Sequence, residues 1–227
     1  MLRWTCLGLL LVVAGCSSGA GSGAADGGPS DGSASRTLDG GGGDDGASVG
    51  DGRSNDGGAI TDGGGGTKAL YPIAVGYTWT YDVQAVGGGA VCATGTHDAK
   101  VVSGPTTLAG KQAYDVTSFC AAAGTSQIAP DPKSDEVSLY YNGSWLTFID
   151  PDLTEGHSWT YFNSSYTWQK EASITVPAGT FTDCWTARQN VTYTAYLTYC
   201  RGVGQVRSYS KDLAGNGWDA KLTKKSF

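Results

Sequence analysis

The aromatic residues of this 227-residue chain are confined to one part of it, and that confinement limits what can fold. All 12 tyrosines, all 5 phenylalanines and six of the seven tryptophans lie in residues 68–227. Residues 17–67 contain 19 glycines and no aromatic residue, and their only large aliphatic side chains are Leu38, Val49 and Ile60. So few apolar groups cannot offset the conformational entropy lost on ordering this segment. The sequence therefore predicts a disordered linker followed by one globular domain.

The net charge of −6 belongs to the same linker. Residues 17–67 carry eight Asp against two Arg, whereas residues 68–227 carry 13 acidic against 12 basic residues. The acidic balance therefore does not indicate an acidic binding face on the domain. A near-neutral domain also lacks the basic surface that nucleic-acid binding requires, so we expect no nucleic-acid partner.

The chain begins with the features of an export signal. Arg3 precedes an apolar run at residues 7–13, which is shorter than the ~20 residues that a membrane-spanning helix needs. The tetrapeptide V-A-G-C at residues 13–16 resembles the bacterial lipobox. This resemblance implies removal of a signal peptide, residues 1–15, and lipidation of Cys16, which begins the linker. Two or three acyl chains would make membrane attachment stable, since each buried methylene contributes about 0.8 kcal/mol.

The predicted location follows from the same resemblance. Ser17 stands where Asp would retain a Gram-negative lipoprotein at the inner membrane. We therefore expect a cell-envelope protein at the outer membrane, periplasmic or surface-exposed, with the membrane as its partner through the N-terminal lipid. The alternatives are an ordinary cysteine beside a standard cleavage site, or an apolar segment that is retained as an anchor.

Strand patterns dominate the domain. Residues 77–83 alternate Tyr, Trp, Tyr and Val with polar residues, as a strand with one apolar face does. Asn142-Gly143 separates two β-rich runs and is a strong hairpin signal, because both residues accept a positive φ. No long window has a helical period. We expect an all-β domain of ten to twelve antiparallel strands, a meander that forms a sandwich or an open barrel.

Comparing the domain with itself shows two motif pairs, both 80 residues apart. G-Y-T-W-T-Y at 76–81 recurs as G-H-S-W-T-Y at 156–161, and S-F-C-A-A-A-G at 118–124 recurs as T-Y-C-R-G-V-G at 198–204. Between them, L-A-G-K-Q-A-Y-D-V resembles P-A-G-T-F-T-D-C-W only with a gap. These matches indicate two similar halves of about 80 residues, each supplying one sheet, with equivalent tryptophans in the first pair. Coincidence among common β-strand residues is the alternative.

Four cysteines lie in the domain: Cys92, Cys120, Cys184 and Cys200. An exported chain meets an oxidising compartment, so we expect two disulfides from the three possible pairings. Proximity in the sequence favours Cys92 with Cys120 and Cys184 with Cys200. A zinc site is the alternative, but no cysteines have C-x-x-C spacing and the two histidines are scattered. We expect no metal and no cofactor.

Three stretches are similar to a loosely defined group of bacterial lipoprotein and secreted domains. They are Y-P-I-A-V-G-Y-T-W-T-Y-D-V (71–83), I-T-V-P-A-G-T-F-T-D-C-W (174–185) and Y-C-R-G-V-G-Q-V-R-S (199–208). The group carries a P-x-x-x-G-x-x-W-x-Y opening, a V-P-A-G-T-F centre and a P-G-V-G-x-V ending, where this chain has Arg201 in place of the Pro. The likeness covers most of residues 70–210. It implies a β-rich exported domain and no catalytic residues.

Few residues offer catalytic chemistry. Nucleophilic catalysis usually needs a histidine beside the nucleophile, and the chain has only His97 and His157. Asp150, Asp152 and Glu155 form a group of carboxylates that glycoside hydrolysis could use. They lie in one Pro-containing loop without a second acid at an identifiable distance, so a solvated turn is the simpler interpretation. We expect no enzymatic activity.

Aromatic rings are the remaining candidates for ligand binding, because exposed rings stack on sugars or pack against apolar ligands. The candidate stacking residues are Trp145, Trp168, Trp185 and Tyr196. D-L-A-G-N-G-W-D at residues 212–219 half matches a calcium loop, but a hairpin turn explains it more simply. The sequence thus favours a lipid-anchored envelope protein with a non-enzymatic domain that binds a glycan or protein, or has a structural role. A carrier with a half-barrel cavity for a lipid or other apolar ligand is the main alternative, ahead of a glycan hydrolase.

Overall fold

The computed structural model describes residues 68–88, 92–120, 124–189 and 193–227. The predicted signal peptide, Cys16 and the linker lie outside these residues. Twelve strands make up the domain: β1 (Thr78–Val86), β2 (Gly95–Leu108), β3 (Lys111–Thr117), β4 (Thr125–Pro130), β5 (Val137–Tyr141), β6 (Ser144–Ile149), β7 (Ser158–Tyr161), β8 (Ser164–Val176), β9 (Gly179–Gln189), β10 (Thr194–Cys200), β11 (Gly204–Lys211) and β12 (Gly217–Ser226). In the described part of the chain, no helix has the length and apolar character needed to cross a membrane.

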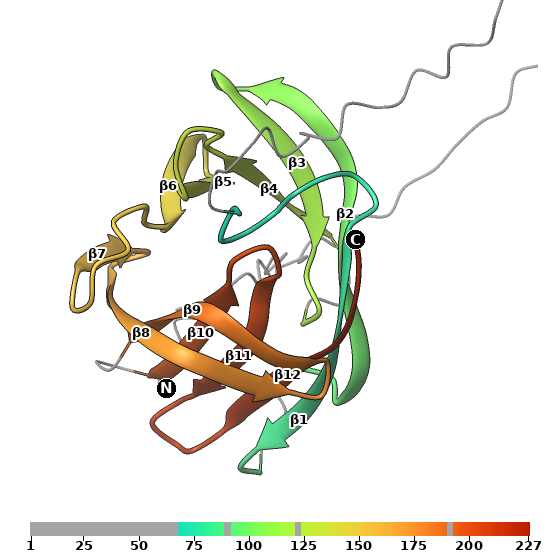
Figure 1. The fold of residues 1–227 in the computed structure, drawn as a ribbon, viewed down its shortest axis with the longest axis vertical. Helices are drawn as coiled ribbons and strands as arrows, with labels where there is room; N and C mark the ends of the chain where they lie inside the picture. Colours follow the sequence, from blue (N-terminus) through green and yellow to red (C-terminus); the bar gives the residue numbers. More distant parts are fainter. Residues whose placement is uncertain (1–67, 89–91, 121–123, 190–192) are drawn as a thin grey trace, which may run out of the picture. The chain divides into compact units, whose positions relative to one another are not determined.

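All twelve strands belong to one antiparallel sheet, in the order β6-β5-β4-β3-β2-β1-β12-β11-β10-β9-β8-β7. The first and last strands pair at its centre, where Thr78 lies opposite Ser226. The outer edges are β6 and β7, which residues 150–157 connect. The sheet curls into a nearly closed barrel (Figure 1). The expected all-β meander is confirmed, in its open-barrel form.

Local sequence explains the strands and their turns. In β1, Trp79, Tyr81 and Val83 are at most 1 % exposed, while the residues between them are partly exposed. This alternation buries one face of the strand, as the sequence predicts. Asn142 and Gly143 have φ angles of 46° and 84° and form the two-residue turn between β5 and β6.

Aromatic side chains fill the core. Tyr71 stacks on Trp79 at 5.3 Å between ring centroids, and Trp159 lies 4.5 Å from Trp168. The Trp79 indole N–H donates to the Val203 carbonyl at 2.6 Å, so its polar atom is satisfied although the ring is fully buried. This bond joins the first half of the domain to the second.

Two disulfides stabilise the domain, Cys92–Cys120 and Cys184–Cys200. They are the pairs that proximity in the sequence favours. The second bond joins directly opposed residues of β9 and β10. The first joins the segment before β2 to the segment after β3.

Each of the two predicted halves contributes six strands, β1–β6 and β7–β12. The expectation that each half supplies its own sheet is wrong, because β1 pairs with β12 and makes one continuous sheet. Trp79 and Trp159 stand in the first strand of their halves, and both are buried. The gapped middle match spans the β2–β3 turn in one half and the β8–β9 turn in the other. The second motif pair does not occupy equivalent places in the two halves. Residues 118–124 follow β3, the third strand of the first half, whereas residues 198–204 join β10 to β11, the fourth and fifth strands of the second half.

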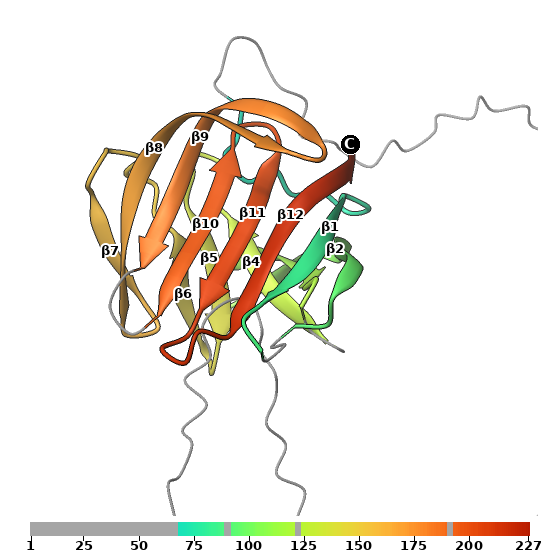
Figure 2. The ribbon, with the colours of Figure 1, turned by 90° about the horizontal axis from the view of Figure 1, so that it is seen from below.

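Two long hairpins occupy corresponding places in the halves. The β8–β9 hairpin arches across the ends of β10 and β11 to β12 (Figure 2), where the Ala178 N–H donates to the Leu222 carbonyl at 3.0 Å. Asp183 in β9 has a φ of 53°, which interrupts the regular strand. The β2–β3 hairpin has two register shifts, and the Trp145 indole N–H on β6 donates to the Ala109 carbonyl in its turn at 3.2 Å.

Candidate functional site

A surface depression of about 480 Å³ lies over strands β8–β11 on the face opposite the core. Alternation positions it, because Trp168 and Ala187 are buried in the core and the next residues, Gln169 and Arg188, point the other way. We call it the Arg188 groove. Its lining residues are Gln169, Glu171, Ser173, Ile174, Thr186, Arg188, Tyr196, Thr198 and Arg207. Ile174 is the only aliphatic residue of this lining, and the other lining residues all carry a polar group.

Successive cross-strand pairs of β9 and β10 lead up to Arg188 and support the groove. The first is the disulfide Cys184–Cys200, which is fully buried. The second is a buried hydrogen bond between the hydroxyls of Thr186 and Thr198, at 3.0 Å. The third carries Arg188. A covalent bond and a buried hydrogen bond fix the spacing of the two strands, so Arg188 projects from a rigid support.

Neutral groups position the Arg188 guanidinium. Nη1 donates to Gln169 Oε1 at 2.7 Å, and Nη2 donates to the Tyr196 hydroxyl at 3.3 Å. The guanidinium carbon lies 4.8 Å from the centroid of the Tyr196 ring. Within the described part of the chain no carboxylate pairs with Arg188, and its Nε has no hydrogen-bond partner. A guanidinium with a fixed plane and an unpaired charge is suited to binding an anion.

Arg207, on the neighbouring strand β11, already has a carboxylate partner. Its Nε and Nη2 donate to the two carboxylate oxygens of Asp219, each at 2.9 Å. These bonds raise the pKa of Arg207. The Lys221 ammonium lies 3.3 Å from the same carboxylate. The two arginines of the groove therefore differ, and Arg188 is the one whose charge is available.

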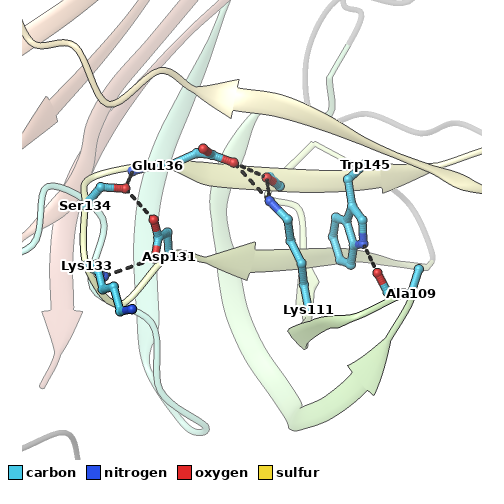
Figure 3. A network of polar contacts seen from close by, with 8 residues as sticks. Ala109, Lys111, Asp131, Lys133, Ser134, Glu136 and Trp145 are labelled. Carbon is cyan, nitrogen blue, oxygen red and sulfur yellow. Dashed lines mark hydrogen bonds and ion pairs between the residues drawn. The ribbon is translucent and has the colours of Figure 1, made fainter.

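The second depression, of about 370 Å³, lies beside the β2–β3 turn and the segment between β4 and β5. The Lys111 ammonium donates to the Glu136 carboxylate at 3.0 Å and to the Ser138 hydroxyl at 2.7 Å (Figure 3). Hydrogen bonds from Ser138 and Lys111 lower the pKa of Glu136. Asp131 accepts bonds from the Lys133 backbone and a nearby hydroxyl, which lower its pKa. The charges of Lys111 and Glu136 are thus paired with each other.

The four candidate stacking residues occupy different environments. Trp168 and Trp185 are 1 % and 7 % exposed, so no external ligand can stack on them. Trp145 is half-buried, and the Tyr140 ring lies 5.0 Å from its own. Tyr196 lies in the Arg188 groove, where its ring faces contact the Arg188 guanidinium and another tyrosine, at 5.4 Å. Of the four, only Tyr196 lines either depression, and its hydroxyl accepts the hydrogen bond from Arg188.

The candidate catalytic residues meet in the loop between β6 and β7. His157 lies between two carboxylates, with Nε2 3.1 Å from Asp150 and Nδ1 3.2 Å from Asp152. Asp150 also accepts the Asp152 N–H at 2.9 Å, and Glu155 accepts the Lys170 N–H of β8. These bonds hold the loop against the edge of the sheet. The sequence did not predict the position of His157 between the aspartates.

The remaining candidates have structural surroundings. His97, on β2, lies 3.2 Å from the Thr94 carbonyl. In the segment that resembles a calcium loop, Asp212 accepts the Asn216 N–H at 2.9 Å and makes a hairpin turn between β11 and β12. Among the described residues, no group of three or more His, Cys, Asp or Glu side chains is arranged to hold a metal ion.

Aromatic residues occupy the interior in which a carrier would hold its ligand. Five tyrosines there have pKa values raised by burial, and their hydroxyls therefore stay neutral: Tyr71, Tyr81, Tyr161, Tyr166 and Tyr199. The Tyr81 hydroxyl donates to the Gln205 carbonyl at 2.8 Å. A ligand of lipid size would have to displace these rings.

Sequence patterns do not single out Arg188. Alternation along β9 predicts only that it faces away from the core. Its partners lie on the two adjacent strands, 19 residues away at Gln169 and 8 residues away at Tyr196. Because strand register decides these contacts, no local motif could have revealed them.

No protein-family model matches the chain. No curated protein matches it either. Among solved structures, a presumed lipoprotein from Parabacteroides distasonis is similar with 14 % identity and a TM-score of 0.40, over 71 % of this chain and 100 % of that one. A presumed exported protein with a YmcC-like fold from Bacteroides fragilis has 12 % identity and a TM-score of 0.41, over 70 % and 100 % of the chains. We infer no function from either structure.

Proposed function

We propose that this chain is a lipid-anchored, non-enzymatic protein of the bacterial cell envelope that binds a glycan in the Arg188 groove. The V-A-G-C sequence at residues 13–16 supports anchorage through Cys16, and Ser17 supports the outer membrane as its location. The glycine-rich composition of residues 17–67 supports a flexible tether, which would place the domain on the order of 40 Å from the membrane.

The observation that carries the binding site is the unpaired, pre-positioned guanidinium of Arg188. Around it, the amide of Gln169 and the hydroxyl of Ser173 line the groove, together with Thr186 and Thr198, whose hydroxyls bond to each other. Such groups match a ligand that is itself rich in hydroxyls, which is the chemistry of a glycan. The disulfide and the threonine pair hold the strands β9 and β10 that carry these groups at a fixed spacing.

The alternatives have less support. For a hydrolase, Asp150, Asp152 and Glu155 would have to act on a substrate, but each of them holds the β6–β7 loop through the contacts described above. For a carrier, the interior would have to open, but the aromatic core occupies it. A binding protein needs neither change.

Membrane attachment is tested with the Cys16→Ser variant of the full chain, expressed in a Gram-negative bacterium. We expect the unaltered protein in the detergent phase of a Triton X-114 partition and the variant in the aqueous phase. Equal partitioning of the two proteins would contradict the anchor. Intact-mass analysis of the purified unaltered protein should show acyl chains on Cys16.

The glycan site is tested by calorimetry of the full-length Cys16→Ser protein with three polymers: dextran, polygalacturonate and alginate. We expect at least one polymer to bind. Ser173→Trp, at an exposed position of the groove lining, should weaken that binding at least about 10-fold by filling the groove. Ala172→Trp adds the same ring at the adjacent exposed position, outside the groove lining, and should leave binding unchanged. Binding of no polymer, or equal binding by both variants, would overturn the proposed site.

A further inference from the structure

We infer that the glycan of the Arg188 groove is acidic and that Arg188 binds a sugar carboxylate. This inference rests on the proposed function and adds the charge of the ligand to it. Its basis is the contrast between the two arginines that line the groove. Arg207 has its own carboxylate partner in Asp219, whereas Arg188 has none in the described part of the chain.

The contacts of Arg188 leave donors for an anion. Two of its N–H groups bond to Gln169 and to the Tyr196 hydroxyl, and these are neutral acceptors that do not cancel its charge. Stacking on the Tyr196 ring fixes the plane of the guanidinium before a ligand arrives. A carboxylate is planar and accepts two parallel N–H bonds, so it matches this arrangement better than a single hydroxyl does. Binding therefore requires little ordering of the side chain.

The rest of the lining favours a sugar acid over an acidic peptide. The lining includes the hydroxyl of Ser173 and the hydrogen-bonded pair Thr186 and Thr198, and Ile174 is its only aliphatic residue. The groove thus offers a peptide only one aliphatic side chain to pack against. Glu171 also lines the groove and forms no ion pair with Arg188, so it can accept hydrogen bonds from sugar hydroxyls. One carboxylate flanked by hydroxyls is the pattern of a uronic acid residue.

The test compares an oligogalacturonate of defined length with its methyl ester, which keeps the sugar backbone and removes the charge. The protein is the full-length Cys16→Ser chain. We expect the acid to bind at least about 10-fold more tightly than the ester, because the charged hydrogen bonds are lost in the ester. Raising the salt concentration should weaken binding of the acid and leave any binding of the ester unchanged.

Variants separate the charge of Arg188 from its shape. Arg188→Gln should weaken binding of the acid about 10- to 100-fold. Arg188→Lys keeps the charge but loses the planar donors, so it should recover only part of that loss. Lys170→Gln is the matched control, since it removes an exposed positive charge from β8 outside the groove lining. Unfolding midpoints of all variants should show that they remain folded.

The outcomes distinguish this inference from the proposed function. Equal binding of the acid and the ester, abolished by Ser173→Trp, would overturn the acidic ligand and retain the glycan site. An unchanged affinity in Arg188→Gln would also overturn the inference. Poly-L-glutamate is the peptide probe, and binding as tight as that of the oligogalacturonate would overturn the choice of a sugar. Binding of none of the glycans would overturn both proposals.

Discussion

The hairpins β2–β3 and β8–β9 occupy corresponding places in the two halves of the sheet, but different contacts hold their ends. Side chains hold the β2–β3 end, through Trp145 to a backbone carbonyl and through Lys111 to Glu136 and Ser138. A backbone bond holds the β8–β9 end, from the Ala178 N–H to β12. The first arrangement pairs the Lys111 cation with a carboxylate of the domain, and the second involves no charged side chain.

This difference explains why the two depressions differ in chemistry. Beside β2–β3, Lys111 and Glu136 neutralise each other as part of the structural tie. Beside β8–β9, the main chain provides the tie, and Arg188 keeps an unpaired charge. The two halves thus have the same arrangement of strands but differ in the chemistry of their surfaces. The predictions below test this comparison, beginning with the largest expected effect.

The corresponding tryptophans of the two halves should contribute unequally to stability. Trp79→Ala should reduce the free energy of unfolding by about 3 to 5 kcal/mol, because it leaves a cavity in the core and removes the bond to Val203. Trp159→Ala should cost less, because that ring lies on an edge strand and its indole N–H has no partner in the described residues. Urea denaturation at neutral pH measures both values. A larger loss for Trp159→Ala would contradict the central position of β1.

The two disulfides should have similar effects on stability and different effects on binding. Replacing either pair of cysteines by alanine should cost about 3 kcal/mol, since the bonds close loops of similar length, with sequence separations of 28 and 16 residues. Loss of Cys184–Cys200 should also weaken oligogalacturonate binding, because this bond fixes the spacing of β9 and β10, which carry Arg188 and Tyr196. Loss of Cys92–Cys120 should leave the binding of the folded protein intact. Denaturation curves and calorimetry of both double variants give the comparison.

The side-chain tie of β2–β3 should be measurable with one substitution. Lys111→Met keeps most of the apolar stem but removes the ammonium, and it should cost roughly 1 kcal/mol of unfolding free energy. Lys170→Met is the control in the second half, because Lys170 forms no ion pair within the described residues and its ammonium lies over the Trp185 ring at 5.6 Å. It should change stability by less than about 0.5 kcal/mol. Equal losses would show that the Lys111 bridge does not hold the hairpin.

Low pH should weaken the contact between Lys111 and Glu136. The pKa of Glu136 is lowered by the Ser138 and Lys111 hydrogen bonds, so the folded state favours its charged form. Its contribution is therefore fully present above the unfolded-state pKa, about 4.3, and is lost as the pH falls through the lower folded-state pKa. Glu136→Gln should flatten the fall in urea midpoint between about pH 5 and pH 3. In the Lys111→Met background this effect should shrink, and an effect of unchanged size would exclude Lys111 as a cause.

Local patterns in the sequence predict much of the fold. Alternation identified β1 and its buried face, Asn142-Gly143 identified the β5–β6 turn, and the first repeat motif marked the first strand of each half. These features depend on residues close in sequence, whose conformations follow from side-chain period and backbone sterics. The all-β meander could be predicted for this reason.

Local sequence patterns do not predict which distant strands pair with each other. A period of two says which face a strand buries but not which strand lies beside it, so the joining of β1 to β12 was missed and two sheets were expected. The contacts of the candidate site also depend on which strands are neighbours. Alternation could orient Arg188, but only the register of β8, β9 and β10 brings it to Gln169 and Tyr196. Aromatic residues were better predictors of the core than of a ligand site, as the burial of Trp168 illustrates.

The pairing of β1 with β12 also determines when the domain can form during synthesis. The strand β12, Gly217–Ser226, lies between β1 and β11, and it is the last of the twelve strands to be synthesised. Until it is available, β1 and β11 are open edges that other chains can pair with, so the nascent polypeptide is prone to aggregation. Premature termination before Gly217 would leave two separate pieces of sheet. Folding of the sheet is therefore completed only after β12 has been synthesised.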